Sequence, residues 1–185
     1  MQPSTLNGNT LRYAYCLGLT TTVSVPAIYD QTYVNTTSGM VYGNQFGPPT
    51  TLNQVANAGE VAWLVGQYAA EATTQDQQVA LQAAIWHVVA AGGGYGHLGT
   101  VSLDPSSAAY GLYTTYLSAL GNNTGDTTAF FWMSPGADGN HYQGLVTADE
   151  RAVEDYGNPV PIPPAIWLLG SSLLALRGVR ARFKK

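Results

Sequence analysis

Two side chains stand out as candidates for chemistry: the thiol of Cys16, the only cysteine, and the carboxamide of Gln82. A single cysteine excludes a framework of intramolecular disulfides and any zinc site built from several cysteines. The thiol is therefore either a small buried apolar group, the commonest state of free cysteine, or a group with a special use. Gln82 is the one polar residue between Val79 and Trp86, so its carboxamide, if buried, needs hydrogen-bond partners or serves another purpose.

The segment around Gln82 predicts a helix from Thr74 to Ala91. Thr74 suits the N-cap and Gln77 follows three residues later, which is the spacing of a capping box, and the glycines at 92–94 end the pattern. The run GGGYGHLG at Gly92–Gly99 predicts a flexible connection that lets the backbone turn sharply. Gln82 shares the i, i+3, i+4, i+7 spacing with four apolar residues, which predicts a face directed at a core and a helix buried on nearly all sides. These four are Val79, Ala83, Trp86 and Val89. A hydrogen-bonded structural glutamine is the simplest interpretation of this position.

Cys16 lies in the run LRYAYCLGL, whose alternating aromatic and apolar residues predict a strand. The pair YC in this run and the later QAAIW, which begins at Gln82, resemble the thioester domains of bacterial surface adhesins. In that family a cysteine thiolate on a strand attacks a glutamine side chain across the core, ammonia leaves, and an internal thioester remains. The resemblance implies that Cys16 and Gln82 form this cross-link.

The same resemblance implies a self-reacting domain rather than an enzyme with turnover, and no cofactor. A surface partner with a free amine or another nucleophile would attack the Gln82 carbonyl carbon and release the Cys16 thiol. EVAWLVGQY at Glu60–Tyr68 is similar to the helix between the two motifs in that family, and HYQGLVT at His141–Thr147 is similar to its closing strand. Leu81 stands where the adhesin pattern usually has threonine.

Two other functions remain open from the residues alone. The first is a cysteine hydrolase that uses a histidine as its base, the candidates being His87, His97 and His141. The local signatures of papain-like and caspase-like enzymes are missing around Cys16, and His87 lies off the helix face of Gln82. The second is a passive surface or matrix protein in which Cys16 and Gln82 never react.

The order of predicted elements indicates an α+β body. Strands come first, a helical pattern starts at Leu52, and the central helix follows. Asp104 and Pro105 predict the N-cap and first residue of a third helix that runs to Gly121. Two strands, at 129–133 and 142–147, close the body. The fold class is therefore α+β and thioester-domain-like, with strands at both ends of the body and a helical middle.

Composition limits the partners of this body. A chain of 185 residues with 45% hydrophobic content supports one domain of moderate size, and the low charged fraction of 10% is common among exported proteins. Before Arg177 the chain has only two cations, against eleven acids. Such a body has no basic surface for phosphates, so the sequence predicts no nucleic-acid partner. We also predict no metal site.

The C-terminal segment differs abruptly from the body. Val160 to Leu176 contains no charged residue, which predicts a separate transmembrane helix. Its order of proline motif, apolar helix and basic end resembles the PEP-CTERM sorting signal that exosortases recognise in Gram-negative bacteria. The motif residues are Val160, Pro161, Ile162 and Pro163, and the basic residues are Arg177, Arg180, Arg182, Lys184 and Lys185. The positive-inside rule places this basic end in the cytoplasm and the body on the other side.

These features define the predicted organisation and location. The thioester domain occupies residues 1–148, a linker 149–159, and the sorting signal with its transmembrane helix 160–185. Exosortase and the membrane are the predicted partners of the tail. We expect export, anchoring in the inner membrane, and final location at the cell surface or in the extracellular matrix of a Gram-negative bacterium. The segment Met1–Asn9 is polar, which predicts a turn-like conformation, and it lacks the features of a signal peptide. We therefore expect the natural chain to carry a signal peptide before it.

Overall fold

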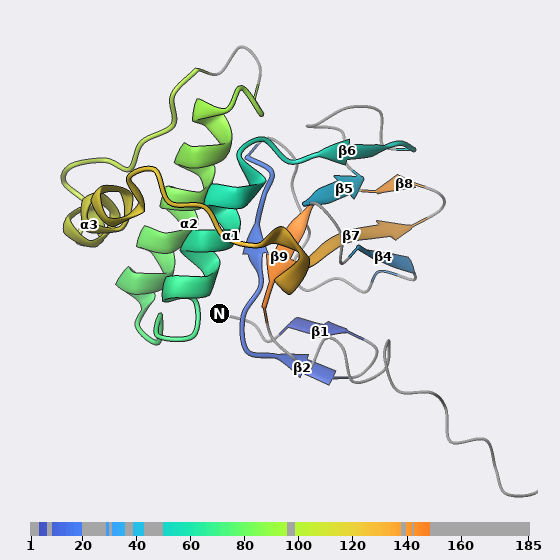
Figure 1. Ribbon diagram of the computed structural model, residues 1–185. Coiled ribbons are helices and arrows are strands. Elements are labelled where there is room, and N and C mark those ends of the chain that lie inside the picture. The colour runs from blue at the N-terminus through green and yellow to red at the C-terminus, as the bar shows by residue number, and fades with distance from the viewer. Residues whose placement is uncertain are drawn as a thin grey trace, which may run out of the picture. The chain divides into compact units, whose positions relative to one another are not determined.

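The computed structural model describes residues 4–6, 9–19, 29, 31–35, 39–42, 50–95, 99–137, 140–141 and 143–148. All of them belong to one compact unit, Met1–Ala152. Short strands come first, three helices follow, and further strands close the unit, so the α+β prediction is confirmed at this level (Figure 1). The helices are α1 (Ala58–Tyr68), α2 (Gln75–Ala91) and α3 (Tyr110–Leu120).

The described strands are antiparallel wherever they pair. They are β1 (Ser4–Leu6), β2 (Asn9–Leu11), β3 (Tyr15–Cys16), β4 (Gln31–Asn35), β5 (Met40–Tyr42), β6 (Leu52–Gln54), β7 (Phe131–Ala137), β8 (Asn140–His141) and β9 (Leu145–Thr147). The main sheet has the order β3-β9-β7-β4, and β8 also pairs with β7. The pairs β1-β2 and β5-β6 form separate two-stranded sheets. Strands from both ends of the unit thus meet in one sheet, which positions Cys16 beside the C-terminal strand β9.

Helix α2 begins and ends as its sequence predicts. The Thr74 side chain accepts a hydrogen bond from the Gln77 backbone and the Gln77 side chain accepts one from the Thr74 backbone, which completes the capping box. At the other end, Gly93 donates to Ala90 O and Gly94 donates to Val89 O, both at 2.9 Å. Gly93 is left-handed with φ of 79°, so these bonds form a Schellman motif.

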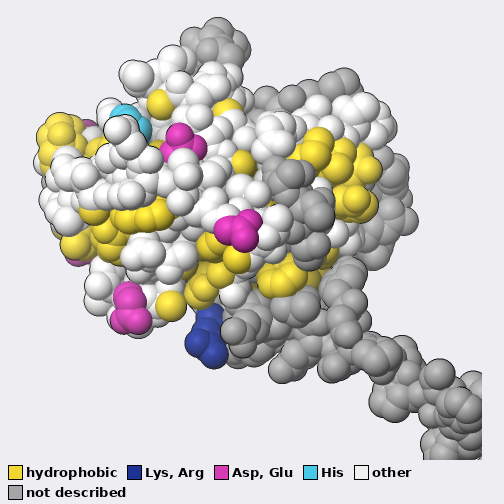
Figure 2. Space-filling model, viewed as in Figure 1, with side chains coloured by type: hydrophobic (Ala, Val, Ile, Leu, Met, Phe, Trp, Pro, Cys, Tyr) yellow, Lys and Arg dark blue, Asp and Glu magenta, His cyan; other side chains and the backbone are white. Residues whose placement is uncertain are grey.

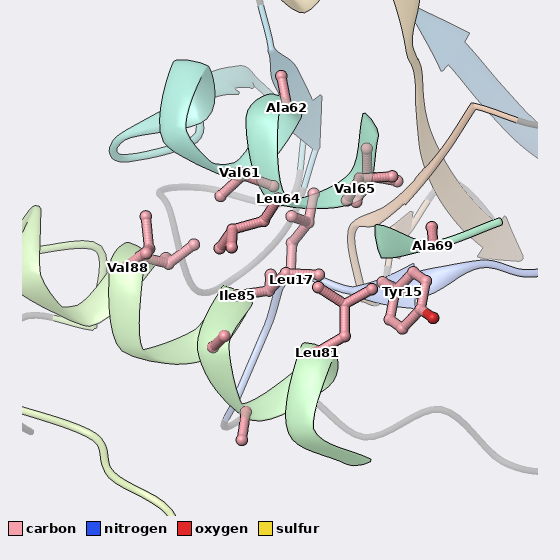
Figure 3. Close-up of a cluster of buried hydrophobic side chains, with 14 of the residues drawn as sticks. Tyr15, Leu17, Val61, Ala62, Leu64, Val65, Ala69, Leu81, Ile85 and Val88 are labelled. Carbon is pink, nitrogen blue, oxygen red and sulfur yellow. The ribbon is translucent and has the colours of Figure 1, made fainter. Parts of the chain in front are cut away.

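The core face of α2 differs from the predicted one. Its residues Leu81, Ile85 and Val88 point toward Val61, Leu64 and Val65 of α1, and Leu17 and Tyr15 pack beside them (Figure 3). Gln82 lies next to this face and is only partly buried. Val79 is 38% exposed, so the prediction of a helix buried nearly all round, with Val79 on its core stripe, is wrong. Apolar spacing alone did not distinguish the centre of the buried face from its border.

Three local predictions are also corrected. The helical pattern predicted from Leu52 starts later, because Leu52 belongs to β6 and α1 begins at Ala58. Asp104 does not cap α3; its Oδ1 accepts from the Ser106 backbone N–H at 2.8 Å, and this turn precedes the helix. Met1–Asn9 was predicted to be turn-like, but Ser4–Leu6 and Asn9–Leu11 pair as a hairpin. A segment of short polar and β-branched residues can form either a turn or a strand, and the presence of a second strand to pair with decides which of the two forms.

On the face drawn in Figure 2, charged side chains lie singly among polar and apolar ones, as the low charged fraction predicts. Within the described ranges, no helix combines the length and the apolar character that crossing a bilayer requires. The predicted linker, the sorting motif at 160–163, the transmembrane segment and the basic residues after it all lie outside the described residues.

Candidate functional site

Cys16 sits on an edge of the main sheet, as far as the described strands show. In the β3-β9 pair, Tyr15 lies opposite Val146 and Cys16 opposite Leu145. The next residue, Leu17, donates its N–H to Gly144 O at 2.8 Å. Because successive residues of a strand direct their backbone groups to opposite sides, the N–H and C=O of Cys16 face away from β9.

The carboxamide of Gln82 occupies that free side. Its Oε1 accepts a hydrogen bond from the Cys16 backbone N–H at 2.9 Å, and its Nε2 donates to the Cys16 carbonyl oxygen at 2.7 Å. One side chain therefore satisfies both backbone groups of one residue, as a further strand would. The carboxamide carbon lies between the two bonding atoms, so the pair of bonds holds it beside Cys16.

The backbone that follows Cys16 is held by two more side chains. The Tyr95 hydroxyl donates to Leu17 O at 2.7 Å, and Gln143 Nε2 donates to Gly18 O at 2.6 Å. Tyr95 is 5% exposed and Gln143 is 4% exposed. Three consecutive carbonyls, from Cys16 to Gly18, are thus each bonded to a side chain from a different part of the chain. We call Gln82, Tyr95 and Gln143 the carbonyl clamp.

The helix C-terminus brings Tyr95 to this site. The Schellman motif reverses the chain directly before Tyr95, and a Cβ on Gly94 would lie 2.6 Å from Val89 Cγ1 and 2.8 Å from Val89 O. Only glycine allows the turn to pass so close to α2. The sharp turn predicted for the glycine run is present in its described part, 92–95, but there the turn is tightly packed rather than a flexible connection, and it places the Tyr95 hydroxyl at Leu17 O.

Burial dominates the electrostatics of the site. It raises the pKa of the Cys16 thiol from its ordinary 9.0 to about 11. Burial also raises the pKa of Tyr15, with smaller contributions from the Tyr13 and Tyr116 hydroxyls. For Tyr95, burial raises the pKa and the nearby Cys16 raises it further. Near neutral pH the thiol and both phenols are therefore protonated.

The histidines give the hydrolase interpretation no described partner for Cys16. His87 Nδ1 lies 2.7 Å from Val101 O and 2.9 Å from the Tyr113 hydroxyl, so it links α2 to α3 and the loop before it. A carbonyl oxygen only accepts, which requires the proton on Nδ1. His97 lies outside the described residues, and only the backbone of His141 is described, in β8.

A backbone N–H donor and a carboxamide oxygen meet at this site. The Cys16 N–H is 2.9 Å from Gln82 Oε1, within the range of oxyanion-hole donors. No group of three or more acidic, histidine or cysteine side chains within the described ranges could hold a metal ion. The site thus brings together a residue with a thiol, a carboxamide, and an N–H that donates to the carboxamide oxygen.

Comparisons of the chain with protein-family models, with curated proteins and with solved structures found no match. The structure places the two residues predicted from sequence, Cys16 and Gln82, in direct hydrogen-bond contact. Sequence reasoning missed Tyr95 and Gln143. Gln143 lay within the HYQGLVT segment, and the available signal was a carboxamide between residues expected to be buried; Tyr95 was the one aromatic residue directly after three glycines.

Proposed function

We propose that this protein forms an internal thioester between Cys16 and Gln82 and uses it to bind an amine-bearing partner covalently at the cell surface. The observation that carries the proposal is the pair of hydrogen bonds between the Gln82 carboxamide and the Cys16 backbone. These bonds hold the carboxamide beside the residue that carries the thiol, and holding two reacting groups near each other supplies much of the rate of an intramolecular reaction. The proposal includes a thioester-domain-like fold for the α+β body.

The first step forms the cross-link. The Cys16 thiol loses its proton, and Sγ attacks the Gln82 carbonyl carbon. The negative charge that develops on Oε1 is stabilised by the Cys16 N–H, 2.9 Å away. The bond from the carbon to Nε2 then breaks, and Nε2 leaves as ammonia after taking up a proton equivalent to the one lost from the thiol. The Nε2 hydrogen bond to Cys16 O orients this leaving nitrogen at the start.

The second step captures the partner. A primary amine attacks the same carbonyl carbon, the carbon–sulfur bond breaks, and the proton lost by the amine goes to the Cys16 thiolate. The product is an amide between Gln82 and the partner, with a free thiol. Cys16 and Gln82 are partly buried, and the fully buried Leu17 and nearly buried Tyr15 flank Cys16 in the chain. This burial would limit the access of water, which a stored thioester needs.

Anchoring completes the proposed function and rests on the sequence of the tail. The uncharged segment from Val160 and the basic residues after Leu176 would insert as one transmembrane helix, and the PEP-CTERM-like motif would direct the chain to exosortase. The body would then face outward. Cysteines of exported proteins usually form disulfides, and the thioester would give this single thiol a role that needs no second cysteine.

Intact mass spectrometry tests the proposal directly. The natural chain should weigh less than its sequence by one ammonia, and methylamine should then add to Gln82. The matched controls are Cys16→Ala and Gln82→Ala, each of which should have its full unmodified mass and take up no methylamine. A full mass together with rapid alkylation of Cys16 by an electrophile such as iodoacetamide would support the hydrolase instead, because an amine does not add to a thiol. A full mass for the natural chain, with no labelling, would leave the passive surface protein.

A further inference from the structure

We infer that Tyr95 and Gln143 are positioning residues for the reaction between Cys16 and Gln82. This inference rests on the proposed function and extends it to two side chains that touch neither reacting atom in the hydrogen bonds described. Both act on the backbone that carries the thiol. The Tyr95 hydroxyl holds Leu17 O at 2.7 Å and Gln143 Nε2 holds Gly18 O at 2.6 Å.

Strand β3 cannot hold Cys16 in place by itself. The strand has only two residues, Tyr15 and Cys16, and it pairs with β9 on one side. Directly after it, Leu17 still donates to Gly144 O, but the following Gly18 has no side chain to hold it in place. Without further bonds, the carbonyls of Leu17 and Gly18 would be unrestrained, and the neighbouring Cys16 thiol would be placed less precisely.

The side chains that donate hydrogen bonds to Cys16 O, Leu17 O and Gly18 O come from three different parts of the chain. A buried carbonyl needs a partner, and one such bond would be ordinary structure. Here three successive carbonyls are each bonded to a side chain, from α2, from the turn after α2 and from the segment before β9. Tyr95 and Gln143 are both more than nine-tenths buried, so water competes poorly for these bonds.

The reaction requires a precise distance between Cys16 Sγ and the Gln82 carbonyl carbon. Displacing a reacting group by about 1 Å costs on the order of a hundredfold in rate. The two bonds of Gln82 fix its carboxamide relative to the Cys16 N–H and C=O, but the direction of Sγ also depends on the backbone torsions of Cys16 and its neighbours. Tyr95 and Gln143 restrict those torsions by holding Leu17 O and Gly18 O, and through them they position the thiol for thioester formation.

The chain offers a matched control in Thr147. Its Oγ1 donates to Tyr13 O at 2.8 Å, which is the same kind of bond to the same segment, three residues before Cys16. Thr147→Val removes this bond with little change of shape. Tyr95→Phe removes one hydroxyl and keeps the buried ring, and Gln143→Asn shortens the donor while retaining the amide.

The experiment follows loss of ammonia by intact mass after cell-free synthesis of the full chain in detergent. Tyr95→Phe and Gln143→Asn should each slow formation by roughly tenfold or more, whereas Thr147→Val should slow it by less than about threefold. Once formed, the thioester should open with methylamine at a similar rate in all folded variants, because opening does not need Sγ to approach the carbon. A general loss of structure would instead speed opening. Circular dichroism establishes that each variant is folded.

Formation in Tyr95→Phe and Gln143→Asn as fast as in Thr147→Val would overturn the inference and leave the thioester proposal intact. Slower formation of the thioester together with an equal increase in its rate of opening would also overturn the inference, because this result would indicate loosened packing. If the natural chain itself loses no ammonia, the proposed function fails, and the inference fails with it.

Discussion

The carboxamide of Gln82 pairs with both the N–H and the C=O of Cys16, although 66 residues separate the two in sequence. Gln82 belongs to α2 and Cys16 to β3 of the main sheet, so this pairing joins the helix to the sheet. Two consequences can be measured separately. The hydrogen bonds should stabilise the fold, which requires only the glutamine, and the proposed thioester should form, which requires the thiol as well.

Cys16→Ala tests the chemical consequence through stability. A cross-link that closes a loop of 66 residues stabilises a fold by about 4 kcal/mol on the loop-entropy estimate used for disulfides, whereas removing an unreacted thiol costs about 1 kcal/mol. We expect a loss near the larger figure in the free energy of unfolding, measured with urea. A loss near the smaller figure would indicate that the cross-link is absent.

Gln82→Ala in a Cys16→Ala background tests the structural consequence. The two hydrogen bonds reach the Cys16 backbone, so they remain after the thiol is removed, and their loss leaves an N–H and a C=O unpaired. We expect a destabilisation of about 2 to 3 kcal/mol by urea unfolding.

Gln78→Ala is the control for that measurement. Gln78 lies one turn earlier on α2, and its Nε2 makes a single bond to Ala72 O at 3.0 Å. The substitution should cost no more than about 1 kcal/mol. Equal effects of Gln78→Ala and Gln82→Ala would mean that the paired bonds contribute nothing special to the fold.

The free-thiol protein should lose stability at alkaline pH. Burial raises the pKa of Cys16 from 9.0 to about 11, so the folded state retains a proton that the unfolded state has lost. The raised pKa contributes about 3 kcal/mol to the free energy of unfolding. This contribution is fully present below pH 9 and is lost as the pH rises through about 11. Urea unfolding of free-thiol protein and of Cys16→Ala across this range isolates it from the tyrosines. A constant difference between the two proteins would contradict the buried thiol.

Gly94→Ala should disrupt the turn that carries Tyr95. The added Cβ would meet Val89 O at 2.8 Å, and backbone atoms cannot move away cheaply. We expect a loss of about 2 kcal/mol in unfolding free energy, in the range of overpacking a core. Gly111→Ala is the control: it lies in α3 with no atom near its added Cβ, and it should stabilise the protein by about 0.5 to 1 kcal/mol.

A chain that ends at Asn158 should keep its fold and lose its membrane association. The uncharged run from Val160 and the basic end after it carry this prediction. Fractionation of cells that express the full and the shortened chain measures the distribution, and circular dichroism of the shortened chain measures the fold. Unfolding on truncation would show that the tail contributes to the core.

The sequence alone determined the local parts of this structure. The capping box of Thr74 and Gln77 and the three glycines after Ala91 predicted both ends of α2, because caps are satisfied by residues only a few positions away. The single polar residue in an apolar helix and the single cysteine on an apolar run also identified Gln82 and Cys16 as candidates. These signals depend on short-range chemistry, and the α+β class follows from their order along the chain.

Only the tertiary structure decided how those parts meet. The edge position of β3 depends on its pairing with β9 from the far end of the chain, and that pairing leaves the Cys16 backbone free for Gln82. Tyr95 and Gln143 became recognisable only once the packed turn and the segment before β9 converged on Leu17 and Gly18. Backbone hydrogen bonds between segments far apart leave no periodic trace in a sequence, because any donor of suitable reach satisfies a carbonyl, and packing alone selects which donor arrives.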